Sequence, residues 1–288
     1  MDRTANVRYL YDGTFDGLLC CVYESVYSRE VPADICAQAQ AQPCLMEDRW
    51  IETDAGRAQC VYRSIPKKIC REAAELVRDV FCSCARDREW LILRFLLMGY
   101  RLGQQAYFMR GHAWVSPLFD AQRHLKNEAH LLLGFVRFSE SGGVLTAQIT
   151  PKNFVLPYIA GHFCRRLGVQ PFLIWDKTHG AAFLREGGRA RLFALDALEL
   201  PAPDAPEAQF RALWRRFYDT IAIAQRENPA CRRTHCPMRY WENMTEFAPD
   251  APAQPALEDA AQAALEDAAQ AALEEIAQPA PACARREA

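Results

Sequence analysis

Residues 128–184 read EAHLLLGFVRFSESGGVLTAQITPKNFVLPYIAGHFCRRLGVQPFLIWDKTHGAAFL, and this stretch decides the fold class. Its apolar pattern changes period along the chain. The apolar run 131–138 predicts a first strand, which a turn over 139–143 closes. Apolar and polar residues then alternate over 144–149, and this alternation predicts a second strand with one buried face.

A helix and two more strands complete this stretch. Asn153 is a suitable N-cap for a helix whose apolar residues recur at helical spacing until Gly168. Residues 171–175 have no polar alternation, which predicts a strand buried on both faces, and residues 181–184 predict one more strand. The order strand, strand, helix, strand, strand predicts an α+β fold with a mixed, largely antiparallel sheet and packed helices.

The residues before this stretch predict elements that pack around it. A strand is expected at residues 7–11, followed by a helix with Thr14 as its N-cap. Residues 32–48 are polar and include two prolines, so we expect a surface loop there. Asp54 is expected to cap a second helix, and Pro66 is expected to break it.

Apolar spacing predicts further helices. The most apolar, at residues 90–102, is too short to cross a bilayer and is expected to be the most buried. Ser116 and Pro117 together start a helix that should run to about His130. The last helix is expected over 207–226, with a buried apolar face. That face consists of Phe210, Leu213, Trp214, Phe217 and Ile221.

Charge is unevenly distributed, and this divides the chain into two regions. The net charge is −2, but the residues from Pro249 onward hold eight acidic side chains and two arginines. The first 248 residues hold 32 basic and 28 acidic groups, a mildly basic balance compatible with nucleic acid. We therefore expect a single α+β domain over 1–248. The repeat ALEDAAQA, at 256–263 and 264–271, marks 249–288 as an acidic tail, helical or disordered.

Several classes of protein are disfavoured by the sequence. The chain has 12 cysteines but no C-x-x-C pair, so the sequence contains neither a zinc-ribbon motif nor a common iron–sulfur motif. Cys231, His235 and Cys236 lack the second ligand pair that a metal site needs, and we expect neither metal nor cofactor. We find no signal peptide and no membrane-length apolar run, so we expect a cytoplasmic protein with reduced thiols.

Four side chains are candidates for acid–base catalysis. Glu128 and His130 flank the entry to the first predicted strand, although residues two apart do not share a helix face. His162 lies on the polar face of the predicted helix, and Asp176 ends the apolar strand, where sites on sheets are commonly built. Each also has a structural interpretation. His162 can lie on a solvated helix face, Asp176 can cap the turn over 177–180, and Glu128 and His130 can have purely structural roles.

Arginines and aromatic residues interleave near the end of the predicted domain. Arginines contact phosphates and guanine, and exposed aromatic rings stack on unpaired bases. A Tyr-Trp pair near the end of a domain can equally cover the core. The candidate nucleic-acid-binding residues are Arg165, Arg166, Arg211, Arg215, Arg232, Arg233, Arg239, Tyr240 and Trp241.

Three blocks of sequence resemble a known bacterial family. They are YLYDGTFDGLL at residues 9–19, the central stretch from EAHLLLGFVRF to QPFLIWD, and NPACRRTHCPMRYWENMTEF at 228–247. Together they resemble a family of DNA metabolism and repair proteins, over about residues 7–247. Members are typically encoded beside a radical-SAM protein involved in DNA modification or repair, and a similar domain is sometimes fused to a uracil-DNA glycosylase-like domain. The family brings no catalytic residues to carry over.

The resemblance implies an accessory factor in DNA repair or metabolism that binds DNA and acts with a radical-SAM partner. Two alternatives remain open. One is a stand-alone hydrolase or glycosylase-like enzyme on damaged bases, which would use the four acid–base candidates. The other is a protein-interaction scaffold whose only ligand is the radical-SAM protein. No P-loop, G-x-G-x-x-G, G-x-S-x-G or H-E-x-x-H motif is present to decide for an enzyme.

Overall fold

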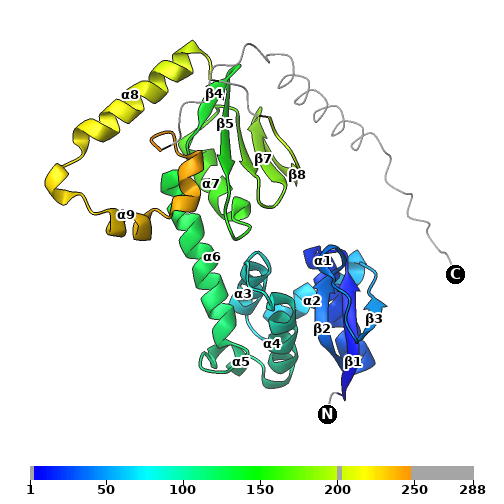
Figure 1. The fold of residues 1–288 in the computed structure, drawn as a ribbon. Coiled ribbons are helices and arrows are strands. Elements are labelled where there is room, and N and C mark those ends of the chain that lie inside the picture. The colour runs from blue at the N-terminus through cyan, green and yellow to red at the C-terminus, as the bar shows by residue number, and fades with distance from the viewer. Residues whose placement is uncertain (1–2, 200–202, 248–288) are drawn as a thin grey trace, which may run out of the picture. The chain divides into compact units, whose positions relative to one another are not determined.

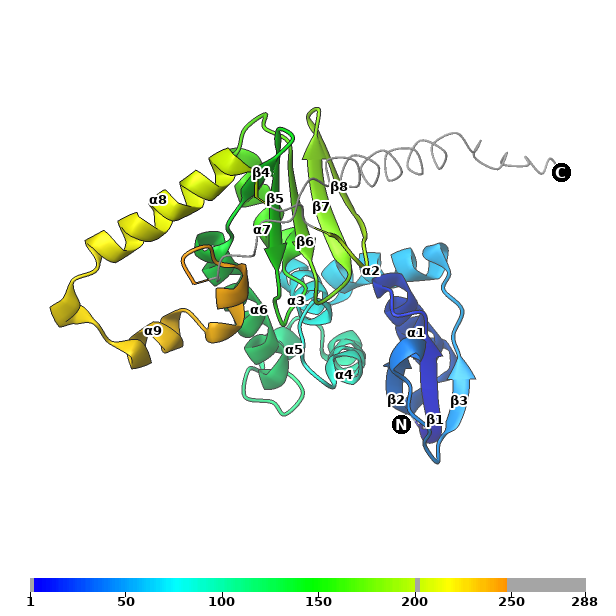
Figure 2. The ribbon, with the colours of Figure 1, turned by 45° about the horizontal axis from the view of Figure 1, so that its top comes forward.

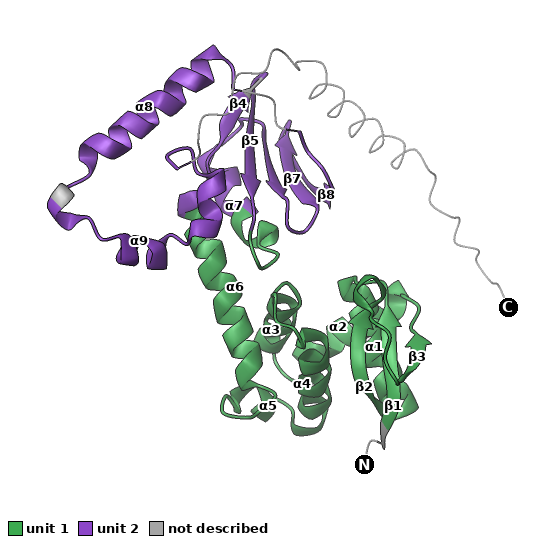
Figure 3. Cartoon of the chain, viewed as in Figure 1, with its two compact units in different colours: residues 1–133, 151–159 green, residues 134–150, 160–288 purple. Residues whose placement is uncertain are grey.

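The structure is a computed structural model that describes residues 3–199 and 203–247. It confirms the α+β class. Contacts divide the chain into two compact units (Figure 3). Unit 1 holds the residues up to 133 together with 151–159, and unit 2 holds residues 134–150 and those from 160 onward. Contacts alone do not test whether the two units fold as one domain, so the single domain over 1–248 stays a prediction. The acidic tail over 249–288 lies outside the described residues.

Unit 1 begins with a three-stranded parallel sheet in the order β2-β1-β3. The strands are β1 (Arg3–Tyr11), β2 (Glu30–Ala37) and β3 (Glu47–Trp50). The expected loop over 32–48 is therefore wrong at both ends, because residues 32–37 belong to β2 and residues 47–48 belong to β3. Polar residues such as Asp34 hid the strand signal, while Val31 and Ile35 are buried beside β1. Only the part between the strands is irregular, with a short 3-10 turn, η1 (Gln38–Gln40).

Helices make up the rest of unit 1 (Figure 1). In chain order they are α1 (Phe15–Ser28), α2 (Ala55–Lys68), α3 (Arg71–Phe81), α4 (Arg88–Leu102), α5 (Gln105–Phe108) and α6 (Ser116–Phe135). Two predicted caps are confirmed. Thr14 Oγ1 accepts the N–H of Gly17 at 3.0 Å, and Asp54 Oδ1 accepts the N–H of Arg57 at 2.6 Å. The helix at 90–102 is confirmed as α4, in which Ile92, Leu93, Phe95 and Leu96 have no exposed surface.

The prediction that Pro66 breaks its helix is wrong. Helix α2 continues to Lys68, and the N–H of Ile69 still donates to the carbonyl of Ile65 at 2.8 Å. Pro66 lies in the last turn, so its ring removes one hydrogen bond and distorts no long segment beyond it. The full burial of the neighbouring Ile65 favours continuation of the helix at this point.

Unit 2 contains a five-stranded sheet in the order β4-β5-β6-β7-β8. The strands are β4 (Ser139–Ser141), β5 (Val144–Ile149), β6 (Phe172–Asp176), β7 (Ala181–Glu186) and β8 (Arg189–Ala194). Strands β5 and β6 are parallel, connected along the chain by α7 (Leu156–Arg166), and the other neighbours are antiparallel. Figure 2 shows the strands side by side. The mixed, largely antiparallel sheet is thus confirmed, and every residue of β6 is buried.

Two details of the central stretch differ from the prediction. Residues 131–138 are not a strand, because α6 continues to Phe135. Leu125, Ala129 and Leu132 form a buried helical face, and a short apolar run cannot by itself distinguish helix from strand. The first strand is instead β4, inside the expected turn, and Gly142 and Gly143 supply the positive φ angles that a tight hairpin needs.

The C-terminal part of unit 2 is helical. It contains α8 (Ala205–Ile221), the 3-10 turn η2 (Ala224–Arg226), α9 (Pro229–His235) and the 3-10 helix η3 (Met238–Asn243). The expected burial of the apolar face of α8 is wrong: its five apolar side chains are between 40% and 68% exposed among the described residues. Helical spacing identifies which side chains share a face, but it does not identify what covers that face.

Two glycines inside helices give a matched test of the packing. A Cβ on Gly99 of α4 would lie 2.2 Å from Ile69 Cδ1, whereas a Cβ on Gly161 of α7 would meet only the Arg165 side chain at 3.6 Å. We expect Gly99→Ala to destabilise the chain by about 1–3 kcal/mol through overpacking. Gly161→Ala should stabilise it by about 0.5–1 kcal/mol, because alanine loses less backbone entropy in a helix. Urea unfolding measures both, and equal effects would contradict the packing described.

Candidate nucleic-acid interface

A buried carboxylate, Glu246, connects the end of the described chain to the rest of unit 2. Its two oxygens accept hydrogen bonds from Arg137 Nη2 at 2.6 Å and Arg137 Nε at 3.1 Å, and Trp214 Nε1 of α8 donates to it at 3.1 Å. Beside it, Arg215 Nε donates to the carbonyl of Thr245 at 2.9 Å. These contacts hold the segment after η3 against α8 and against the residues that precede β4.

The pKa of Glu246 reflects this environment. Burial alone would raise the pKa, but hydrogen bonds and charge from Arg137, with the Trp214 N–H, outweigh the burial and hold it below the usual value. The bidentate contact between a guanidinium and a carboxylate is among the stronger side-chain hydrogen bonds. Glu246 is therefore ionised in the folded chain at neutral pH.

Arg232 and two aromatic rings form a second cluster. Trp241 stacks on Phe247 with ring centroids 4.6 Å apart, and its Nε1 donates to the carbonyl of Cys236 at 3.0 Å. The guanidinium carbon of Arg232 lies 5.5 Å from the Trp241 centroid and 5.9 Å from that of Phe247. The face of an aromatic ring attracts the cation, so these contacts orient an exposed arginine.

Tyr240 is not a stacking platform for a base. It is 2% exposed and packs against Phe135 with ring centroids 5.7 Å apart, so the alternative in which it covers the core is correct for this residue. The neighbouring Asn243 fixes η3 to the end of β5 through Thr150 and Gln148, each at 3.0 Å. Trp241 is half-buried and has one face on Phe247. Of the predicted pair Tyr240 and Trp241, it is therefore the one that remains a candidate for stacking on a base.

The predicted arginines fall into two groups. Arg165, Arg166, Arg232, Arg233 and Arg239 are exposed. Arg211 and Arg215 are half-buried and serve the fold: Arg211 Nε donates to Glu207 at 2.8 Å and its Nη2 donates to Ser139, while Arg215 bonds the Thr245 carbonyl. Arg216, next to them on α8, is exposed. Three of the five exposed predicted arginines lie on α9 and η3, and the other two lie on α7.

The structure does not pair Glu128 with His130. Glu128 is buried, and its oxygens accept the backbone N–H groups of Lys152 at 3.0 Å and Asn153 at 2.7 Å, while His130 is exposed on the same helix. Asn153 also donates its side-chain amide to Glu128 and accepts the N–H of Cys84 at 2.9 Å. It is therefore not the N-cap of α7, which begins at Leu156, and its expected capping role is wrong.

His162 and Asp176, in unit 2, have different surroundings. The Nε2 of His162 is buried without a hydrogen-bond partner among the described residues, and its ring packs edge-on against Phe163. Asp176 has no exposed surface and accepts the N–H groups of Thr178 at 3.0 Å and His179 at 3.2 Å. The turn-capping role expected as an alternative for Asp176 is present.

One residue near Asp176 was not predicted from the sequence: His179, whose Nδ1 lies 2.7 Å from Asp176 Oδ2. The pair follows the buried strand β6, at the edge where the carboxyl ends of the parallel strands β5 and β6 meet. A carboxylate at Nδ1 fixes the orientation of an imidazole and the position of its proton. The spacing D-x-x-H directly after an all-apolar strand was the signal that could have identified it.

Comparison with known families shows which family this chain belongs to. A family described as a domain of unknown function, DUF4130, matches residues 86–246, more than half of the chain. The chain belongs to this family. The match begins at α4 and ends at Glu246, so it includes all of the described sheet of unit 2 and the candidate interface, and it leaves β1–β3 outside. No curated protein matches the chain. No helix among the described residues is long and apolar enough to cross a membrane.

Glu246 should make the stability of this segment depend on pH. The pKa of Glu246 is lowered in the folded state, so its contribution to the free energy of unfolding is complete above the unfolded-state pKa of about 4.3. That contribution is lost as the pH falls through the folded-state pKa. We expect Glu246→Gln to lower the free energy of unfolding by about 1–3 kcal/mol at neutral pH, and by much less in acid. Urea unfolding at both pH values measures this. The exposed Glu242→Gln is the control, and equal losses in both variants would contradict the role of Glu246.

Proposed function

We propose that this protein is a cytoplasmic accessory factor in DNA repair or metabolism. In this proposal it binds DNA through the surface of α9 and η3, and it acts with a radical-SAM partner. The family resemblance of the sequence suggests the biological setting. The observation that carries the DNA-binding part is the exposed set Arg232, Arg233 and Arg239, next to the half-buried Trp241.

The geometry of this surface suits a phosphate backbone. Arg232 is oriented by Trp241 and Phe247, so less side-chain entropy is lost when its guanidinium binds a phosphate. Arg233 follows it on α9, with its Nε donating to the carbonyl of Pro229 at 3.2 Å. Contacts of this kind give affinity without sequence specificity, as expected for an accessory factor.

The exposed apolar face of α8 is the surface that we assign to the radical-SAM partner. Phe210, Leu213, Trp214, Phe217 and Ile221 lie on one helical face, and each is at least 40% exposed among the described residues. Contiguous apolar patches of this kind are typical of protein–protein contacts, where aromatic residues are enriched. Binding of a partner here would leave Arg232 and Arg233 on α9 available to DNA.

DNA affinity should depend steeply on salt. On duplex DNA, each phosphate that the protein binds adds about 0.9 to the magnitude of the slope of log K against log salt, so Arg232→Gln with Arg233→Gln should lower that magnitude by about 2. Fluorescence anisotropy with short single- and double-stranded DNA measures the slope for the full chain. The matched control is Arg63→Gln with Arg78→Gln, which removes the same charge from exposed sites in unit 1.

Two results would overturn the DNA-binding proposal. One is absence of binding to either form of DNA at low salt, and the other is an equal decrease in slope for both double variants. A complex with the radical-SAM protein that survives high salt and contains no nucleic acid would instead support the scaffold alternative.

The Asp176–His179 pair favours one second candidate, a hydrolase or glycosylase-like activity on damaged bases. General acid–base groups typically contribute about 10²–10⁴-fold to a rate. If the pair is catalytic, His179→Ala and Asp176→Asn should each lower base release from damaged DNA by about 100-fold, while the exposed His124→Ala should not. Circular dichroism verifies folding, since Asp176 also caps its turn. No base release by the wild-type chain would eliminate this candidate.

A further inference from the structure

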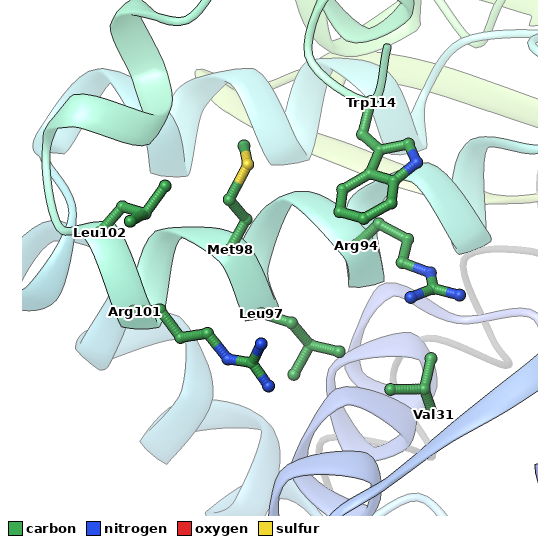
Figure 4. A pocket seen from close by; sticks show the side chains of 7 residues that line it. All are labelled: Val31, Arg94, Leu97, Met98, Arg101, Leu102 and Trp114. Carbon is green, nitrogen blue, oxygen red and sulfur yellow. The ribbon is translucent and has the colours of Figure 1, made fainter. Parts of the chain in front are cut away.

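Unit 1 contains a cavity of about 400 Å³ (Figure 4). Its wall is formed largely by α4, with Val31 of β2 and Trp114 from the segment before α6. The volume is within the range of about 300–1,000 Å³ that is typical of small-molecule sites. Two arginines, Arg94 and Arg101, are among the described residues that line it, and no carboxylate is among them.

Two tryptophans hold Arg94 at the edge of this cavity. Its guanidinium carbon lies 4.7 Å from the centroid of the Trp90 ring and 5.2 Å from that of Trp114, and the two rings meet edge to face. The guanidinium group of arginine commonly stacks on aromatic rings through its flat faces. Its N–H donors lie in the plane and point outward, so they remain directed at an acceptor that approaches the edge.

The charge of Arg94 is incompletely compensated. Its Nε is buried and has no hydrogen-bond partner among the described residues, and no described residue forms a salt bridge with this guanidinium. Burial lowers the pKa of Arg94, which shows that its charge is partly removed from water. The Arg94 side chain as a whole is half-buried, so an anion at its outer nitrogens would gain charge-assisted hydrogen bonds.

Arg101 adds a second positive charge to the same wall. It follows Arg94 by seven residues on α4, two helical turns along, so both side chains leave the helix on related faces. Figure 4 shows Leu97 between the two guanidinium groups. Leu97 and Met98 supply an apolar surface next to the charges.

We propose that this cavity binds a small organic anion, with its charged head at Arg94 and its apolar or aromatic body on Leu97 and Met98. Arg94 is oriented before the ligand arrives, so little side-chain entropy is lost on binding. The apolar wall lowers the local dielectric constant and strengthens the contact between the charges. The site is independent of the DNA-binding proposal, because none of its residues belongs to α9 or η3.

Two fluorescent probes with a similar aromatic body test the proposal on the full chain. One is 8-anilino-1-naphthalenesulfonate, which carries an anionic sulfonate, and the other is N-phenyl-1-naphthylamine, which is neutral. We expect the sulfonate to bind the wild-type chain at least about tenfold more tightly, since a charge-assisted hydrogen bond contributes that much. Equal affinity for the two probes would overturn the proposal.

Variants locate the site. Arg94→Met should lower the affinity for the sulfonate about tenfold while changing that for the neutral probe less than about twofold. Leu97→Trp, which fills the cavity, should weaken binding of both probes. Arg63→Met, at an exposed position on α2, is the control and should change neither. A loosened fold would bind the neutral probe more strongly, so unfolding is distinguishable. Sulfonate affinity that survives either Arg94→Met or Leu97→Trp would overturn the proposal.

Discussion

The buried carboxylate of Glu128 is the constraint on which the organisation of unit 1 depends. A buried charge is tolerated only where hydrogen bonds replace those to water, and here the donors are the N–H groups of Lys152 and Asn153 and the Asn153 amide. Asn153 in turn accepts the N–H of Cys84, and the N–H of Phe154 donates to the carbonyl of Cys82 at 2.8 Å. One carboxylate thus fixes α6, the residues before α7, and the connection between α3 and α4.

The sequence suggested Glu128 as a candidate for acid–base catalysis but did not show which groups it contacts. A glutamate beside a histidine at the start of an apolar run is compatible with acid–base chemistry. The donors that satisfy it lie 24 and 25 residues further along the chain, and no local pattern shows that they return to it. Asn153 shows the converse: its residue type favours a helix cap, but a buried carboxylate binds it instead.

The sequence predicted best where the signal was local. The alternation of β5, the all-apolar β6, and the caps Thr14 and Asp54 are properties of neighbouring residues, and the structure confirms each. The prediction from the sequence was wrong for β2, because that strand is stabilised by pairing with β1. It was also wrong at the end of α6, because a short apolar run is compatible with both a helix and a strand. For the candidate interface, residue type identified the arginines, but only tertiary contacts separate the exposed Arg232 from the structural Arg211 and Arg215.

Strand β8 has a consequence for how copies of this protein behave in concentrated solution. It is the last strand of the five-stranded sheet, and it pairs with β7 along one side. An edge strand with unpaired backbone groups is a template for pairing with another molecule, and its Leu192 is 48% exposed. Arg189 and Arg191 are exposed on the same strand. Two like charges on this short strand repel an identical strand approaching in register, so β8 discourages intermolecular sheet extension and aggregation.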